Sequence, residues 1–151
     1  MAEFGVKYWA ELRSRYKGVL WRVEIAERRY TGTAEEMAFD GSTPLQITWE
    51  KRGEEFYVPV KASEATINIL CRENFRYLSL FTSDPRQFRV SILRSGQLYW
   101  RGYVTADLYS EAFAAPPYTV SVKAVDGFNL LSSIPFRDLV RTGTTGRRSL
   151  W

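Results

Sequence analysis

The sequence predicts a mainly β fold, or an α+β fold with little helix. Three observations carry this prediction. Apolar and polar residues alternate in several separate runs, a tight turn joins two of these runs, and aromatic residues make up 15% of the chain. Alternation with a period of two is the pattern of half-buried strands, and aromatic side chains fit pleated surfaces well. The length of 151 residues suits one compact domain with its own core.

The amino-terminal part of the chain predicts a hairpin. Residues 8–13 and 19–27 both alternate, and Trp21 lies on the apolar face of the second run with three aliphatic side chains. A turn around residues 16–18 joins the two strands. After a loop at 40–44, residues 45–50 predict a third strand.

The strands that follow are predicted with a break between them. Residues 56–60 and 65–71 are both typical of strands, and the stretch from Pro59 onwards interrupts the pairing between them. The strongest local signal comes later, where residues 88–94 and 97–104 alternate on either side of Ser95-Gly96. That dipeptide is typical of a tight two-residue hairpin.

The last predicted elements are a strand and a short helix. Residues 118–124 alternate and are entered through Pro116-Pro117. Asp126 is predicted to cap a helix by accepting hydrogen bonds from amides that have no partner inside the helix. Phe128 and two later apolar residues would share one side of this helix, and Pro135 would end it.

The residues that usually carry catalysis are scarce. The chain has no histidine, which excludes Ser-His and Cys-His pairs and every histidine-ligated metal. Cys71 is the single cysteine, so no intrachain disulfide forms, and its apolar run predicts a core position. The adjacent carboxylates Glu35-Glu36 and Glu54-Glu55 lie in polar stretches, where such pairs are usually solvated. We therefore predict no enzymatic activity, no cofactor and no metal.

Charge and hydropathy give no sign of a nucleic-acid partner or a membrane segment. The net charge is +4, but Lys and Arg are scattered, and the densest pairs are Arg28-Arg29 and Arg147-Arg148. Nucleic-acid binders usually concentrate such charge on one face, so we predict no specific nucleic-acid partner. No run approaches the roughly 18 apolar residues of a membrane helix. We expect a protein made in the cytoplasm with no membrane segment.

One predicted strand has aromatic residues on both faces. Alternation places Tyr99, Arg101 and Tyr103 on one face, opposite Trp100 and Gly102. Another protein chain is the cover that we expect for the first face, and these three residues are the candidate interface. The alternative is a single-stranded nucleic-acid-binding β-barrel, in which bases stack on the aromatic rings between arginines.

Several short stretches, in this order, resemble one family. They are residues 18–25, 63–69, 75–84, 96–104, 107–111, 117–118 and 124–128. From about Tyr8 to Phe136 the chain is similar to the amino-terminal region of tail-tip proteins, also called baseplate-hub or distal-tail proteins, of Bacteroidetes phages and prophages. Their order carries the resemblance, because each stretch alone is short.

The resemblance implies a structural role in the virion tail. Residues 1–136 would form a tail-tube-like β-barrel or sandwich with one or two short helices. Residues 137–151 would be a linker or the start of a following segment, with the chain cut short. Such domains form rings under the tail tube, with a trimer favoured over a hexamer, and contact other tail proteins. The resemblance carries no catalytic residue onto this region, and any enzymatic or receptor-binding activity would lie in later domains.

The matched residues are given structural roles. Trp21 belongs to the first hairpin and Trp100 anchors the core, while Gly102 allows a close approach by another backbone or ring. A second set fixes the loop before the last strand and the start of the helix: Tyr109, Glu111, Tyr118, Asp126 and Gly127.

Overall fold

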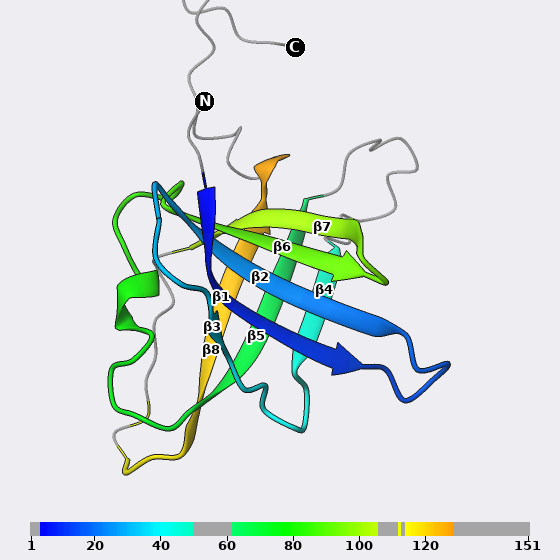
Figure 1. Ribbon diagram of the computed structural model, residues 1–151, viewed down its shortest axis with the longest axis horizontal. Helices are drawn as coiled ribbons and strands as arrows, with labels where there is room; N and C mark the ends of the chain where they lie inside the picture. Colours follow the sequence, from blue (N-terminus) through cyan, green and yellow to red (C-terminus); the bar gives the residue numbers. More distant parts are fainter. Residues whose placement is uncertain (1–3, 50–61, 106–111, 113, 129–151) are drawn as a thin grey trace, which may run out of the picture.

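The structure is a computed structural model that describes residues 4–49, 62–105, 112 and 114–128. Within these residues, eight strands form one mixed sheet, and helical structure is limited to one 3-10 turn, η1 (Leu78–Leu80), and the two residues Gly127 and Phe128 (Figure 1). The strands are β1 (Phe4–Arg13), β2 (Leu20–Arg28), β3 (Glu35–Glu36), β4 (Leu45–Trp49), β5 (Ser63–Cys71), β6 (Phe88–Arg94), β7 (Gln97–Val104) and β8 (Tyr118–Asp126). The predicted mainly β fold is confirmed.

The sheet curls back over itself. Its strand order is β3-β1-β2-β6-β7-β8-β5-β4, and every neighbouring pair is antiparallel except β1 and β3. In Figure 1, β1, β2, β6 and β7 cross in front of β8, β5 and β4. Register shifts in β1 and at the β6–β7 pair mark bulges, which bend and twist strands. The sheet is not closed into a barrel, because its end strands β3 and β4 do not pair with each other.

The core lies between the two curled halves of the sheet. Its largest fully buried side chains come from the four strands β2, β5, β6 and β8 and from η1: Val23, Ile25, Ile67, Ile69, Cys71, Leu80, Val90, Ile92, Val120 and Val122. On β5 the buried positions alternate with half-buried ones along the whole strand, as the period-two pattern predicts. The predicted core position of Cys71 is confirmed.

The chain after β3 connects the two ends of the sheet at one side. The amide of Met37 donates to the Trp9 carbonyl at 2.7 Å, and the amide of Leu70 donates to the Ala38 carbonyl at 2.8 Å. Phe39 forms an isolated bridge with Ile69. Residues 37–40 therefore cross from β1 to β5, while the far half of β1 and all of β4 face each other across an unpaired seam.

Both predicted hairpins are confirmed. The β6–β7 turn has positive φ at Ser95 (49°) and Gly96 (81°), which is the backbone of the tight turn that the dipeptide predicts. The β1–β2 turn likewise has positive φ at Lys17 and Gly18. The predicted strand at 56–60, the helix residues after Phe128 and the segment 137–151 lie outside the described residues. The two-residue strand β3 was not predicted.

Candidate functional site

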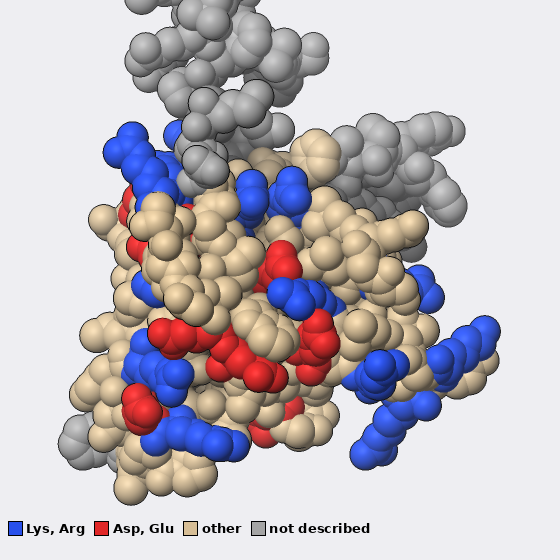
Figure 2. All heavy atoms as spheres, in the orientation of Figure 1, with Lys and Arg blue, Asp and Glu red and all other residues tan. Residues whose placement is uncertain are grey.

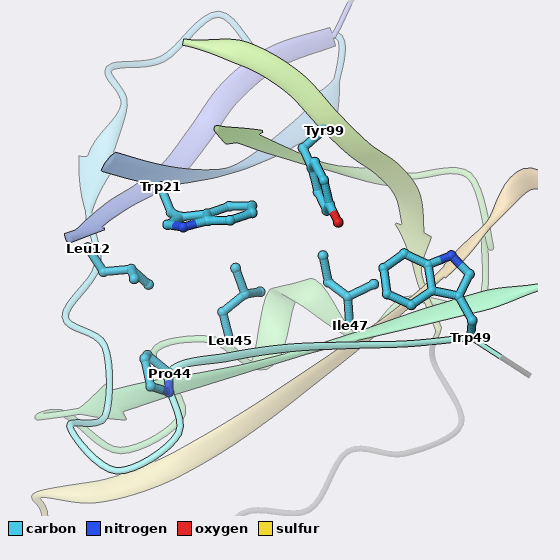
Figure 3. A pocket seen from close by; sticks show the side chains of 7 residues that line it. All are labelled: Leu12, Trp21, Pro44, Leu45, Ile47, Trp49 and Tyr99. Atoms are coloured by element: carbon cyan, nitrogen blue, oxygen red, sulfur yellow. The ribbon is translucent and has the colours of Figure 1, made fainter. Parts of the chain in front are cut away.

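An apolar cleft opens at the unpaired seam of the sheet. It has a volume of about 290 Å³. Its lining residues are Leu12 of β1, Trp21 of β2, Tyr99 of β7, Pro44, which precedes β4, and Leu45, Ile47 and Trp49 of β4. Figure 3 shows Trp21 and Tyr99 pointing towards Leu45 and Ile47 from the opposite half of the sheet. The cleft therefore lies where β1 and β4 fail to pair.

Two aromatic rings form one wall of the cleft. The rings of Trp21 and Tyr99 meet edge to face, with centroids 5.1 Å apart and planes at 86°, a favoured aromatic geometry. The guanidinium of Arg94 lies 5.7 Å from the Trp21 ring centroid. Because Trp21 and Arg94 are also cross-strand partners, this contact places a positive charge beside the wall.

A bulge turns Tyr99 towards the cleft. Ile92 pairs with Trp100 and Leu93 pairs with Leu98, so Tyr99 is an extra residue in β7. Of the three residues of the predicted interface, Tyr99 lines the cleft, whereas Arg101 and Tyr103 do not. Simple alternation misplaces it, since an inserted residue shifts the pattern by one.

The opposite wall is the edge strand β4. Leu45, Ile47 and Trp49 line the cleft, while Gln46 and Thr48 are exposed. The Asn68 amide donates to the Pro44 carbonyl at 3.0 Å, and hydrogen-bonded pairs alternate along an antiparallel ladder. Leu45, Ile47 and Trp49 therefore direct their backbone amides and carbonyls away from β5. Within the described residues, no strand pairs with this outer edge.

The cleft exposes large apolar groups. The side chains of Trp49 and Tyr99 are each 47% exposed. Aromatic side chains gathered at an opening are typical of interaction sites, whereas single exposed apolar residues need no explanation. The free strand edge and the aromatic wall thus belong to one site.

Several positive charges lie at the hairpin ends beside the cleft. Within the described residues, five cationic side chains form ion pairs with carboxylates: Lys7, Arg22, Arg28, Arg76 and Lys123. Arg13, Arg15, Lys17 and Arg94 form none with any described carboxylate. Figure 2 shows Lys and Arg side chains projecting over the tip of the β1–β2 hairpin, away from the acidic cluster at the centre of that view. The Ser95 amide donates to the Leu20 carbonyl at 2.8 Å, so the two hairpin ends lie side by side.

The other two candidate interface residues lie on a different surface. Arg101 is exposed, and Tyr103 is half-buried against Phe4, with ring centroids 6.5 Å apart. The guanidinium of Arg89 lies 4.4 Å from the Phe4 ring centroid. Arg89 is the cross-strand partner of Tyr103. These four residues form the β7 outer patch, which is separate from the cleft.

The predicted structural residues have the following positions. Trp100 is buried, which confirms its place in the core, while Trp21 is half-buried at the cleft. A Cβ on Gly102 would collide with the Trp100 ring and the Val125 carbonyl, which confirms the predicted close approach. Tyr118 is buried, and its hydroxyl donates to Asn74 Oδ1 at 3.4 Å. Tyr109 and Glu111 lie outside the described residues.

Asp126 has more partners than the predicted cap. Its Oδ1 accepts from the Phe128 amide at 3.2 Å, a contact of the capping kind, and Gly127 and Phe128 are helical. Its Oδ2 also accepts from the Ser63 amide at 2.7 Å and from the Ser63 hydroxyl at 2.6 Å. Sequence reasoning missed Ser63, because it lies 63 residues away and carries no local signal.

The described residues hold little that resembles a reaction centre. No group of three or more His, Cys, Asp or Glu residues among them could hold a metal. Glu35 is exposed and its carboxylate lies 3.3 Å from Arg76, while Glu54-Glu55 falls outside the described residues. The Cys71 thiol is buried and donates to the Glu73 carbonyl at 2.9 Å. In the same part of the chain, no helix has the length and apolar character to cross a membrane.

Comparison with known proteins identified no relative of this chain. No protein-family model, no curated protein and no solved structure matches the chain.

Proposed function

We propose that the chain is a structural component of a phage or prophage tail tip, which docks to tail-tube protein and assembles into a ring with copies of itself. A trimer is favoured over a hexamer. The observation that carries the docking part is the aromatic cleft, in which Trp49 and Tyr99 are each 47% exposed. The proposed ring assembly and the proposed location in the tail rest on the resemblance of residues 8–136 to tail-tip proteins.

The cleft supports docking because it exposes two kinds of group that a partner can cover, apolar side chains and backbone hydrogen-bonding groups. Its side chains are large and apolar, and aromatic residues are enriched where proteins meet. The β4 edge beside them offers backbone donors and acceptors, and such an edge pairs readily with another chain. Both features favour a protein partner.

Ring contacts are assigned to the β7 outer patch. Arg101 is exposed and, among the described residues, its guanidinium has no carboxylate partner, while Tyr103 and Phe4 present aromatic surface beside it. A ring needs two different surfaces on each subunit, because its contacts are head to tail. The β7 outer patch supplies one of them.

The second candidate is a single-stranded nucleic-acid-binding protein. It is favoured by Arg94, whose guanidinium lies 5.7 Å from the Trp21 ring centroid, and by three further cations at the neighbouring β1–β2 hairpin end, Arg13, Arg15 and Lys17. Stacking of bases on aromatic rings between cations is how such proteins bind. Beside the cleft, however, these charges lie only at the hairpin ends among the described residues, and β4 carries no charged residue along its side of the cleft.

One binding experiment separates the two candidates. Fluorescence anisotropy would be measured with tail-tube protein and with a labelled oligo-dT at physiological salt. We expect binding to tail-tube protein, and binding to oligo-dT with a dissociation constant on the order of 10⁻⁴ M or weaker. Sub-micromolar oligo-dT affinity that falls steeply with salt, together with no binding to tail-tube protein, would replace docking by nucleic-acid binding.

A further inference from the structure

We infer that the cleft binds an extended segment of a partner protein, which adds as a strand to the outer edge of β4 and carries carboxylates beside apolar side chains. The inference rests on the proposed docking function, but it commits only to the occupant of the cleft. It assigns the cleft a ligand chemistry that is independent of the ring contacts on the β7 outer patch.

The first step concerns the backbone. Leu45, Ile47 and Trp49 direct their amides and carbonyls away from β5, as the Pro44–Asn68 hydrogen bond and the alternation of the ladder require. The same three residues line the cleft with their side chains. A strand that pairs with this edge would therefore lie along the mouth of the cleft, as in recognition by strand addition.

The second step concerns the side chains of the occupant. Every other residue of an added strand faces the same side, so alternate residues would point between β4 and the rings of Trp21 and Tyr99. The volume of about 290 Å³ is at the lower end of the roughly 300–1,000 Å³ that is typical of small-molecule sites. A space of that size, with apolar walls, suits a few aliphatic side chains and not a large polar ligand.

The third step concerns charge. Arg94 contacts the cleft wall through Trp21, and Arg13, Arg15 and Lys17 belong to the neighbouring hairpin end. The single carboxylate of β1, that of Glu11, is already engaged by Arg22 at 3.0 Å. Among the described residues, the hairpin end of the cleft is therefore positive, which favours carboxylates on the occupant there.

Charge also separates this occupant from the two others. A second copy of this chain has a net charge of +4, so it would bring further positive charge to a positive hairpin end. A nucleic acid needs cations along its whole path to contact successive phosphates, and the β4 wall, Leu45–Trp49, has none. A segment that is apolar where it meets β4 and acidic where it meets the hairpin ends fits both the uncharged β4 wall and the positive hairpin ends.

Labelled synthetic peptides test the inference by fluorescence anisotropy at physiological salt. One ten-residue probe alternates valine with aspartate. The controls alternate valine with lysine and threonine with aspartate, and oligo-dT serves as the nucleic acid. We expect the valine–aspartate peptide to bind at least about tenfold more tightly than each peptide control, because only it matches both the apolar walls and the positive hairpin end.

Variants locate the site. Ile47→Pro removes one outward amide from the edge, where proline is tolerated, and should weaken binding of the valine–aspartate peptide about tenfold, whereas Ile47→Val retains the amide and should leave it nearly unchanged. The double variant Arg15→Glu, Arg94→Glu should transfer the preference to the valine–lysine peptide. Its control, Arg72→Glu with Arg86→Glu, makes the same charge change at two exposed residues outside the cleft and should retain the original preference. Circular dichroism checks that each variant is folded.

Several outcomes overturn the inference. Equal affinity for all three peptides, no effect of Ile47→Pro in a folded protein, or tighter binding of oligo-dT than of any peptide would each remove it. Self-association lost in Ile47→Pro but not in Ile47→Val would assign the cleft to a second copy. If tail-tube protein still binds while the peptides fail, the docking function survives and only the occupant is wrong.

Discussion

The indole of Trp100 is hydrogen bonded to the side chain of Ser63 inside the protein, with Trp100 Nε1 donating to Ser63 Oγ at 2.9 Å. Ser63 in turn donates to Asp126 through its hydroxyl and its amide. All three residues are buried. This chain connects β7, β5 and β8 at the end of the sheet where the described chain leaves β8, and it gives Asp126 a structural role beyond capping.

Replacing Asp126 tests the hydrogen-bonded chain. Asp126→Ala should lower the free energy of unfolding by about 3 kcal/mol, because two donors of Ser63 lose their buried acceptor and each costs roughly 1–3 kcal/mol when left unpaired. Urea denaturation would measure this loss. Asp40→Ala is the control, since among the described residues the Asp40 carboxylate accepts only from the exposed Ser42 hydroxyl, at 3.3 Å. A loss near 1 kcal/mol, the usual cost of a missing cap, would leave capping as the only role of Asp126.

Gly102 is expected to tolerate no side chain. Gly102→Ala should destabilise the protein by about 2 kcal/mol, because overpacking forces backbone or ring shifts, and a Cβ here meets the Trp100 ring and the Val125 carbonyl. Gly41→Ala provides the comparison, since no described residue has an atom within 4 Å of its added Cβ. Thermal unfolding followed by circular dichroism would show a lower midpoint for the first variant alone. Equal midpoints would contradict the tight packing at β7.

Tyr77 predicts a dependence of stability on alkaline pH. Burial raises the pKa of the Tyr77 hydroxyl above its ordinary value, against the opposing charge of Arg76. A raised pKa contributes stability that is fully present below the unfolded value, about 10, and is lost as pH rises through the folded value. Tyr77→Phe cannot ionise and keeps the ring contact with Tyr8 (centroids 5.4 Å apart). Its urea midpoint should therefore fall less than that of the wild type above pH about 10, and parallel falls would refute the role of burial.

Local pattern was enough to predict most of the strands. The alternating runs 19–27, 88–94 and 97–104 correspond to β2, β6 and β7. They could be predicted because a half-buried strand shows alternating apolar and polar residues in its own sequence. The turn residues Ser95-Gly96 likewise specify their hairpin by backbone conformation alone. Strand β3 was missed because two exposed glutamates, Glu35 and Glu36, have no periodicity to detect.

The cleft could not be predicted, because it depends on relations between distant residues. Trp21, Trp49 and Tyr99 come from three strands whose order in the sheet is not written in any one of them. The bulge at Tyr99 moved that ring from the expected face, since alternation alone does not reveal an inserted residue. The partnership of Ser63 with Asp126 is hidden for the same reason. Composition had indicated excess aromatic surface but not its location.

Ring assembly is the central claim, and light scattering on the intact protein, followed by particle imaging, tests it most directly. The wild type, alone or with tail-tube protein, should form closed rings, with a mass of three subunits favoured over six. Arg101→Glu with Tyr103→Ala should abolish the rings, because both residues belong to the β7 outer patch. The matched control, Arg72→Glu with Tyr16→Ala, changes the same residue types at exposed positions and should form rings as the wild type does. A wild-type protein that stays monomeric and shows no ring, even with tail-tube protein, would contradict the account.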